Sequence, residues 1–183
     1  MSRQPLFKLL CLGCMVVAIF IVTALCMNGL PINQKSLPLF VNTSTSLPLG
    51  FYYMKKVQVL KRGDVIRLCL PEEISKFSVE RGYLRHGTCS GGSTRIGKPV
   101  LALHGDTVVV TQKMIHVKGH HSFNIPIHTH DQRGKRLPNA IGTHILKEGQ
   151  CFLLSIHHKL SYDSRYYGPI PCGVSPYSIL EKL

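Results

Sequence analysis

The sequence predicts one mostly-β domain carried on an N-terminal membrane helix, and three observations support this. Residues 9–27, LLCLGCMVVAIFIVTALCM, contain no charged side chain. The rest of the chain holds several β-branched or aromatic runs bounded by Gly, Pro or Asp, and one short stretch with a helical pattern. A chain of 183 residues has room for an anchor and one domain with its own core.

The apolar stretch is long enough to cross a bilayer. At ~1.5 Å per residue its helix spans roughly 28 Å, close to the ~30 Å hydrocarbon core. Arg3 and Lys8 precede it, which favours a cytoplasmic N-terminus. The alternative is a cleaved signal peptide, but Leu25 and Met27 stand where a cleavage site needs small residues. We therefore expect four parts: a cytoplasmic N-terminus at 1–8, a transmembrane anchor at 9–29, a linker at 30–38 and an extracytoplasmic domain at 39–183.

Six segments favour β-strands, and one favours a helix. The expected strands are 39–43, 50–57, 64–70, 99–105, 106–117 and 150–158. Residues 71–82 favour the helix, because Pro71 suits its first turn, two glutamates follow at the positive end of the helix dipole, and Gly82 suits its end. Residues 118–149 are rich in turn formers and predict an excursion that contains a hairpin.

The net charge of +13 raises the question of nucleic-acid binding, because basic surfaces bind phosphate. Lys and Arg are scattered among apolar segments and form no long run. A domain that lies near anionic lipid headgroups explains the same charge. We therefore expect inner membrane lipid as a partner and no nucleic acid.

Four cysteines lie in the expected domain: Cys69, Cys89, Cys151 and Cys172. An even number in an exported domain permits two disulfides. Sequential pairing, Cys69 with Cys89 and Cys151 with Cys172, closes two loops of about twenty residues, each stabilised by roughly 3 kcal/mol. Four free, buried thiols are the alternative.

The ten histidines do not predict a metal site. The pairs at 120–121 and 128–130 lie among turn residues, whereas zinc needs ligands that converge from defined spacings. We expect neither a metal nor an organic cofactor. The stretch TCSGGS, 88–93, lacks the Gly-Asp of chymotrypsin-like proteases, and the chain has no G-x-S-x-G motif.

A serine with a lysine as its base is the remaining chemistry. Residues 42–50, NTSTSLPLG, concentrate hydroxyl groups directly before an aromatic strand. A serine needs a neighbouring base, and a lysine serves as one only when burial keeps it neutral. Lys98 stands at the head of a long apolar run, and Pro99 favours an extended backbone there.

Three stretches in order resemble the membrane-bound signal peptidases, which use a Ser/Lys dyad. They are NTSTSLPLG, KPVLALHGD at 98–106 and SYDSRYYGPI at 161–170. The resemblance implies the β-domain of LexA/signal peptidase type, mostly β with one short helix, behind the N-terminal transmembrane helix. The chain departs from the pattern at Pro99 and His104, where Arg and Pro are usual, but neither change removes a catalytic atom.

Within that group the chain resembles the TraF-type conjugative-transfer peptidases. In SLPLGFY the proline comes two places after the serine, whereas housekeeping signal peptidases place it three after. RGDVIRLCLP and DQRGKRLP also resemble TraF. TraF-type peptidases mature the pilin of conjugative type IV secretion systems, and some cyclise it.

The resemblance assigns roles residue by residue. Ser46 is the nucleophile, and Thr45 is a weaker alternative. Lys98 is the general base. The hydroxyl of Ser44 and the backbone N–H of Ser46 form the oxyanion hole, while Asn42 serves the turn.

A second group of residues supports the dyad. Ser161 orients the lysine, and Asp163 and Arg165 lie behind it. A buried ion pair with no part in the chemistry is the preferred interpretation of Asp163 and Arg165. Gly105 and Asp106 form a structural turn.

The expected function is a single-pass inner-membrane endopeptidase whose catalytic domain is periplasmic. Its substrate is a pilin or another preprotein, and mating-pair formation proteins are further expected partners. A general signal peptidase is one alternative, and a non-catalytic component of pilus assembly or of the secretion channel is another. LexA-like repressors share the dyad, but the anchor argues against them.

Overall fold

The computed structural model describes Met15, Val17 and residues 38–174 and 176–183. The expected N-terminal part at 1–8, nearly all of the anchor at 9–29 and most of the linker at 30–38 thus lie outside the described residues. In the described part of the chain, no helix combines the length and the apolar character that a membrane crossing requires.

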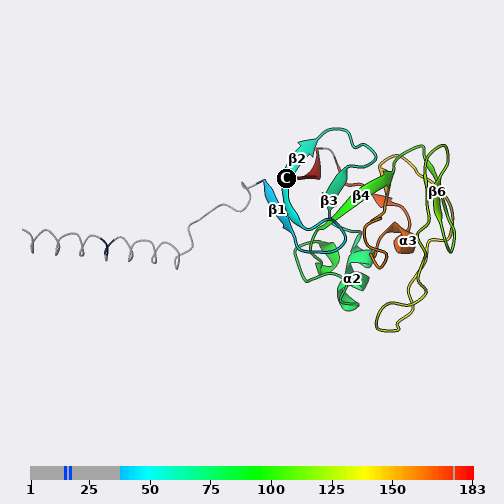
Figure 1. Cartoon of the computed structure of the whole chain (residues 1–183), viewed down its shortest axis with the longest axis horizontal. Helices are drawn as coiled ribbons and strands as arrows, with labels where there is room; N and C mark the ends of the chain where they lie inside the picture. Colours follow the sequence, from blue (N-terminus) through cyan, green and yellow to red (C-terminus); the bar gives the residue numbers. More distant parts are fainter. Residues whose placement is uncertain (1–14, 16, 18–37, 175) are drawn as a thin grey trace, which may run out of the picture. The chain divides into compact units, whose positions relative to one another are not determined.

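Two antiparallel sheets form the domain, as Figure 1 shows. The first has seven strands in the order β1-β2-β11-β3-β4-β9-β10. They are β1 (Leu39–Asn42), β2 (Gly50–Val57), β11 (Tyr177–Lys182), β3 (Val65–Leu68), β4 (Ile96–Ala102), β9 (Gln150–Leu153) and β10 (Ile170–Pro171). The second has the order β7 (Ser122–Phe123), β6 (Ile115–Val117), β5 (Thr107–Val110), β8 (Gly142–Ile145). The expectation of a mostly-β domain is confirmed.

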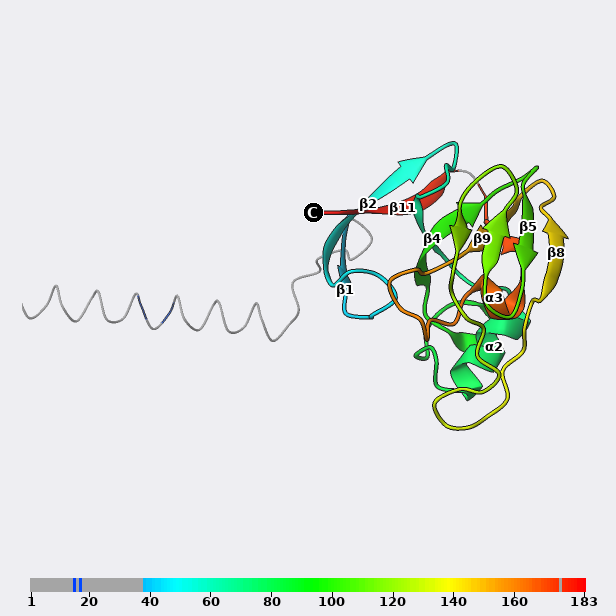
Figure 2. The ribbon, with the colours of Figure 1, turned by 45° about the vertical axis from the view of Figure 1, so that its right-hand side comes forward.

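The helices are short. The expected helix at 71–82 is present as α2 (Glu72–Glu80), which starts directly after Pro71. The N–H of Gly82 donates to the carbonyl of Val79, and Gly82 has a φ of 72° that suits glycine. One 3-10 turn, η1 (Ser90–Gly92), and a second helix, α3 (Ser164–Tyr167), were not expected. In Figure 2, α2 and α3 lie on the same side of the domain.

Alternating burial along the strands builds two main cores. Residues of β4 alternate between buried and half-buried, as period-two strands do. One core lies on the seven-stranded sheet and includes Ile66, Ile96, Val100, Leu153 and Ile179. The other lies on the four-stranded sheet and includes Val108, Val110, Ile115, Phe152 and Leu154. Because β4 and β9 contribute to both cores, their positions are held from two directions.

One expectation about strands was wrong, and one strand that joins the sheet was not expected. Residues 106–117 form a hairpin rather than one strand, because Thr111 and Met114 close a turn through their backbone and the Thr111 hydroxyl. Strand β11, which was not predicted, lies between β2 and β3 and pairs with both. A short strand near the chain end carries little sequence signal, but its pairing joins the first two strands to the rest of the sheet.

The four cysteines divide into two kinds. Cys69, after β3, is bonded to Cys89, before η1. Cys151 and Cys172 are free, buried thiols in this structure, so the second expected disulfide is not formed. A hydrogen bond to Cys172, together with burial, raises the pKa of the Cys151 thiol.

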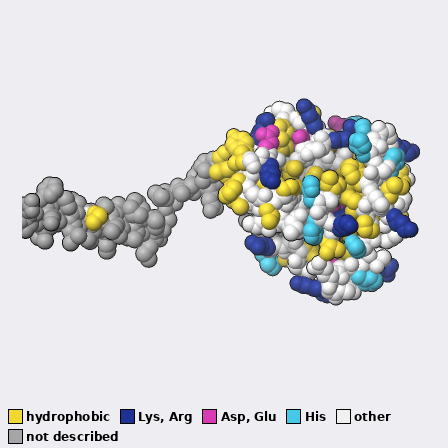
Figure 3. All heavy atoms as spheres, viewed as in Figure 1, with side chains coloured by type: hydrophobic (Ala, Val, Ile, Leu, Met, Phe, Trp, Pro, Cys, Tyr) yellow, Lys and Arg dark blue, Asp and Glu magenta, His cyan; other side chains and the backbone are white. Residues whose placement is uncertain are grey.

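The surface is uneven in character, as Figure 3 shows for one face. Hydrophobic side chains gather over β1 and β2, where Val41 is 54% exposed and Phe51 is 60% exposed. Lys and Arg side chains are spread over the same face, and acidic side chains are few.

Candidate active site

The turn between β1 and β2 positions Ser46, and Asn42 organises this turn. The Asn42 amide donates to the carbonyls of Ser44, Leu47 and Pro48 at 2.8–3.1 Å. Its Oδ1 accepts from the N–H and the hydroxyl of Ser44. Leu47 packs with Tyr52 and Leu180 in a third, small core. The hydroxyl-rich stretch is therefore an ordered turn with Ser46 half-buried at its end.

Lys98 lies on β4, so the pairing of this strand with its neighbours fixes the lysine backbone. Its register partner on β3 is Ile66, and the neighbouring residues Ile96 and Val100 on the same face are buried. The lysine is itself only 5% exposed. The apolar residues around Lys98 in the sequence thus help to bury its side chain.

Three serine hydroxyls surround the Lys98 amine. Lys98 Nζ lies 3.0 Å from Ser46 Oγ and 3.2 Å from Ser155 Oγ, and it also donates to Ser161 Oγ. Ser46 Oγ and Ser161 Oγ are 3.3 Å apart. The structure therefore brings together Ser46, Lys98 and Ser161, the three residues that the sequence motifs indicated.

Burial changes the protonation of this amine. It lowers the pKa of Lys98 to about 8, because the charged form loses its hydration. The carboxylate of Asp163 acts in the opposite direction, and Arg165 adds a smaller lowering effect. A lysine with such a pKa is neutral in a useful fraction of molecules near neutral pH, as a general base requires.

Asp163 and Arg165 form a fully buried ion pair behind the dyad. Arg165 Nε and Nη2 donate to the two Asp163 oxygens at 2.8 and 3.0 Å. Arg165 Nη2 also donates to the Ser161 carbonyl at 2.7 Å, and Asp163 accepts from the Ser155 N–H. Neither side chain forms a hydrogen bond with Lys98 or Ser46, and the pair instead bonds to the backbone of Ser155 and Ser161, the two serines that contact the lysine amine.

The sequence did not indicate Ser155, and the hydroxyl of Ser44 forms a hydrogen bond that was not expected. Ser155 follows β9 in an apolar run with no motif of its own, so only the contact with Lys98 identifies it. The Ser44 hydroxyl donates to Asn42 Oδ1 at 2.8 Å, so it is engaged within its own turn. The N–H of Ser46 donates to no described residue.

Residues outside the dyad occupy structural positions. Asp106 accepts from the Arg62 guanidinium and from the Leu103 N–H, in a turn where Gly105 has a φ of 86°.

Across the described residues, no group of three His, Cys, Asp or Glu side chains is arranged to hold a metal ion.

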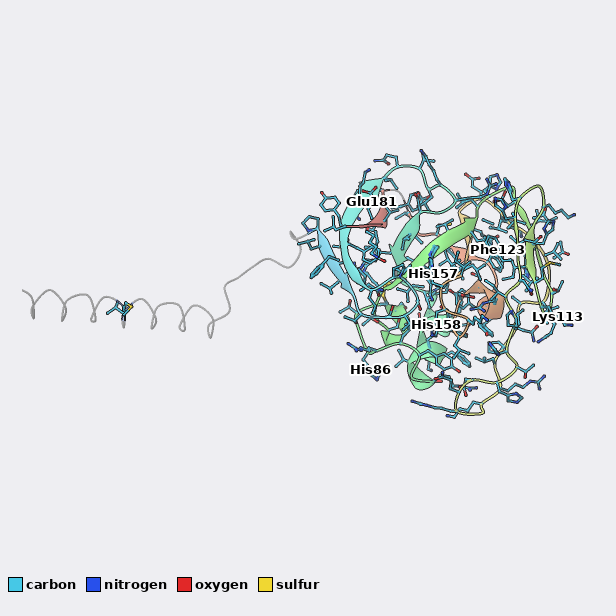
Figure 4. The ribbon with its side chains drawn as sticks, in the orientation of Figure 1. His86, Lys113, Phe123, His157, His158 and Glu181 are labelled. Atoms are coloured by element: carbon cyan, nitrogen blue, oxygen red, sulfur yellow. A yellow bond between two sulfur atoms is a disulfide. The ribbon has the colours of Figure 1, made fainter. Side chains whose placement is uncertain are left out.

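Two grooves meet at Ser46. One, of about 710 Å³, runs along β1 and β4 and includes Lys98 in its wall. The other, of about 520 Å³, passes Ser161, Tyr162 and the loop around Asp131. His158, labelled in Figure 4, lines this second groove, whereas its neighbour His157 faces a separate apolar groove that Phe123 also lines. The two grooves leave room for an extended chain on both sides of Ser46.

Comparison with known proteins identifies relatives of this chain. The signal peptidase family, peptidase S26, matches residues 6–173. The conjugal transfer protein TraF of Agrobacterium fabrum is 35% identical over 135 residues, which cover 72% of this chain and 74% of that protein. The plasmid transfer protein TraF of Escherichia coli is 32% identical over 133 residues, which cover 71% and 74%.

A solved structure of a signal peptidase I from Enterococcus faecalis also matches, with a TM-score of 0.35 and 17% identity over 63% of this chain and 92% of that one. The family match covers most of the chain, and the relatives cover more than two thirds of it. The chain belongs to the signal peptidase family, peptidase S26, and its relatives include the conjugal transfer proteins TraF.

Proposed function

We propose that this protein is a membrane-anchored serine endopeptidase that matures the pilin of a conjugative type IV secretion system. The observation that carries the proposal is the contact between the buried Lys98 amine and the Ser46 hydroxyl, 3.0 Å apart. The names of the TraF relatives supply the conjugative context. The periplasmic location of the domain and the anchor at 9–29 belong to the same proposal.

The first step is acylation of Ser46. The neutral Lys98 amine accepts the Ser46 proton while Ser46 Oγ attacks the carbonyl carbon of the scissile bond. Ser155 and Ser161 accept hydrogen bonds from the resulting ammonium and keep it directed at Ser46. The ammonium then gives its proton to the leaving amine, and an acyl ester on Ser46 remains.

The second step removes the acyl group. Lys98, neutral again, accepts a proton from the attacking group, which is water in hydrolysis or the amino terminus of the pilin in cyclisation. The attacking oxygen or nitrogen bonds to the acyl carbon, the ester bond to Ser46 Oγ breaks, and Lys98 returns the proton to Ser46 Oγ. The negative oxygen that forms in each step needs hydrogen-bond donors. The Ser46 N–H is one donor, and the Ser44 hydroxyl becomes the second once it exchanges its hydrogen bond to Asn42.

The test is mass spectrometry of a candidate pilin precursor that is co-expressed with wild-type, Ser46→Ala and Lys98→Met chains. We expect only the wild type to shift the precursor mass. A product one water lighter than the linear cleaved peptide indicates cyclisation. Thr45→Ala is the matched control, because Thr45 is exposed and forms no hydrogen bond with Lys98; it should retain processing.

Other outcomes point to the alternatives. Equal processing by all variants would contradict the dyad and favour a non-catalytic role in pilus assembly. If the wild type cleaves many unrelated preproteins as well as the pilin precursor, the enzyme is a general signal peptidase.

A further inference from the structure

The groove along β1 and β4 has an unusual electrostatic character. Three arginines line it in addition to Lys98: Arg67 on β3, Arg85 after α2 and Arg95 before β4. No aspartate or glutamate is among the residues that line it. The segment that carries Arg85 is marked by its neighbour His86 in Figure 4.

Of the three arginines, Arg67 is the one on a strand that pairs with β4. Its register partner is Gly97, the residue before Lys98, and Arg67 and Lys98 both line the groove. Its guanidinium lies over the Phe40 ring, with Cζ 5.7 Å from the ring centroid. This contact holds the guanidinium between β1 and β3, at the wall of the groove.

Arg67 has no counter-ion among the described residues. Its Nε is buried and forms no hydrogen bond with any described residue, and its guanidinium contacts the Phe40 ring. The four ion pairs of the described chain use Lys55, Arg62, Arg81 and Arg165 instead. Burial and the nearby charge of Arg95 both lower the pKa of Arg67. A cation in this position is stabilised when an anion binds beside it.

We propose that this groove selects substrates that carry an acidic side chain two to five residues before the cut, with Arg67 as the principal determinant. The inference rests on the proposed function, because it needs a peptide in the groove. A substrate added as a strand beside β1 and β4 advances ~3.3 Å per residue. In this proposal the residues before the cut occupy this groove and those after the cut occupy the groove past Ser161, so several residues before the cut pass Arg67 while the scissile bond lies at Ser46.

A positional scan tests the proposal with the full chain in non-ionic micelles. Internally quenched peptides carry Ala before the cut and either Asp or Asn at each of positions two to five before it. We expect Asp to exceed Asn in kcat/KM by about tenfold at one or more positions, because a carboxylate forms charge-assisted hydrogen bonds with Arg67. The preference should weaken as salt is raised.

Variants identify the responsible residue. Arg67→Met keeps an aliphatic side chain against Phe40 and should bring the Asp/Asn ratio close to one. Arg67→Glu should favour Lys over Asp at the same position. Lys113→Met is the matched control, because Lys113 is an exposed cation on the β5–β6 turn (Figure 4); its ratio should equal that of the wild type.

The outcomes separate the two proposals. If the wild type cleaves Asp and Asn peptides equally, the acidic preference is refuted and the peptidase function stands. If no peptide is cleaved and the pilin precursor is also left intact, the proposed function fails, and the inference fails with it. If Arg67→Met leaves the peptide ratio unchanged but weakens binding to phosphatidylglycerol vesicles, the arginines serve the membrane surface and the proposal is overturned.

Discussion

Lys98 combines two demands that normally oppose each other. As the proposed general base it must be buried to lose its proton, yet its amine must reach the hydroxyl of a serine in a surface turn. β4 meets the first demand through apolar neighbours, and the hydroxyls of Ser46, Ser155 and Ser161 meet the second. Three neutral partners orient the amine without adding a negative charge, which would raise its pKa.

The pH dependence of kcat/KM follows from this arrangement. The pKa of Lys98 is lowered from 10.5 to about 8, so the neutral base forms as pH rises through about 8. We expect kcat/KM to rise about tenfold per pH unit below that value and to level off above it. Initial rates from pH 6 to 10 with a peptide that lacks titratable side chains check this. A flat profile over that range would show that Lys98 is not the base.

Removing the Ser155 hydroxyl should affect the base rather than substrate binding. Ser155→Ala deletes an acceptor of the Lys98 ammonium, which favours the neutral form and lowers the pKa of Lys98 further. We expect kcat to fall about tenfold with KM nearly unchanged, and the acidic limb to move to lower pH. Ser122→Ala, an exposed serine beside His116, is the control. An unmoved acidic limb would leave Ser155 with a packing role only.

At the scale of elements, a disulfide and a buried ion pair fix the segments on either side of the site. Cys69 and Cys89 close a loop that contains α2 and returns the chain to β4, the strand that carries Lys98. The Asp163–Arg165 pair performs a similar task at the other side of the site, since it ties α3 to Ser155 and Ser161.

Loss of this disulfide should lower stability. The sequence separation of 20 residues corresponds to about 3 kcal/mol in the chain-entropy estimate. We expect the Cys69→Ser/Cys89→Ser variant to lose that much free energy of unfolding, as measured by urea denaturation in micelles. Reduction should destabilise the wild type and leave the variant unaffected. If reduction destabilises both equally, a bond other than Cys69–Cys89 contributes.

At the scale of the whole molecule, a high positive net charge is combined with an exposed apolar surface over β1 and β2. The chain has a net charge of +13, and the β1–β2 surface exposes Leu39, Val41, Phe51 and Tyr53. Contiguous exposed apolar side chains mark an interaction surface, and basic charge favours an anionic one. The turn that holds Ser46 connects these same two strands.

Vesicle sedimentation of residues 38–183 tests this surface. We expect Val41→Ser/Phe51→Ser to reduce binding to vesicles that contain phosphatidylglycerol at least threefold, because burial of both side chains in the interface is lost. Ile145→Ser, which replaces an exposed side chain on β8, should bind like the wild type. Equal losses in both variants would mean that binding is not localised to β1 and β2.

Periodic and motif-bearing segments were predictable because their signals are local. Most strands and α2 follow from apolar alternation and helix-end residues within a few positions of each other. The hairpin at 107–117 was missed because its turn, Thr111–Met114, contains no Gly, Pro, Asn or Asp to mark it in the sequence. Strand β11 depends on partners more than a hundred residues away, at β2 and β3, and no local pattern reports them.

The sequence by itself determined the family, the mostly-β class and the motifs around Ser46, Lys98 and Ser161, since these depend on spacings within short segments. Only the tertiary structure decided which groups share one site. Lys98 contacts Ser46 across 52 residues and Ser155 across 57, and those contacts appear only when the sheet has formed. The burial of Lys98, its lowered pKa and the lack of a counter-ion for Arg67 among the described residues depend on such distant neighbours, so they were visible only in the folded chain.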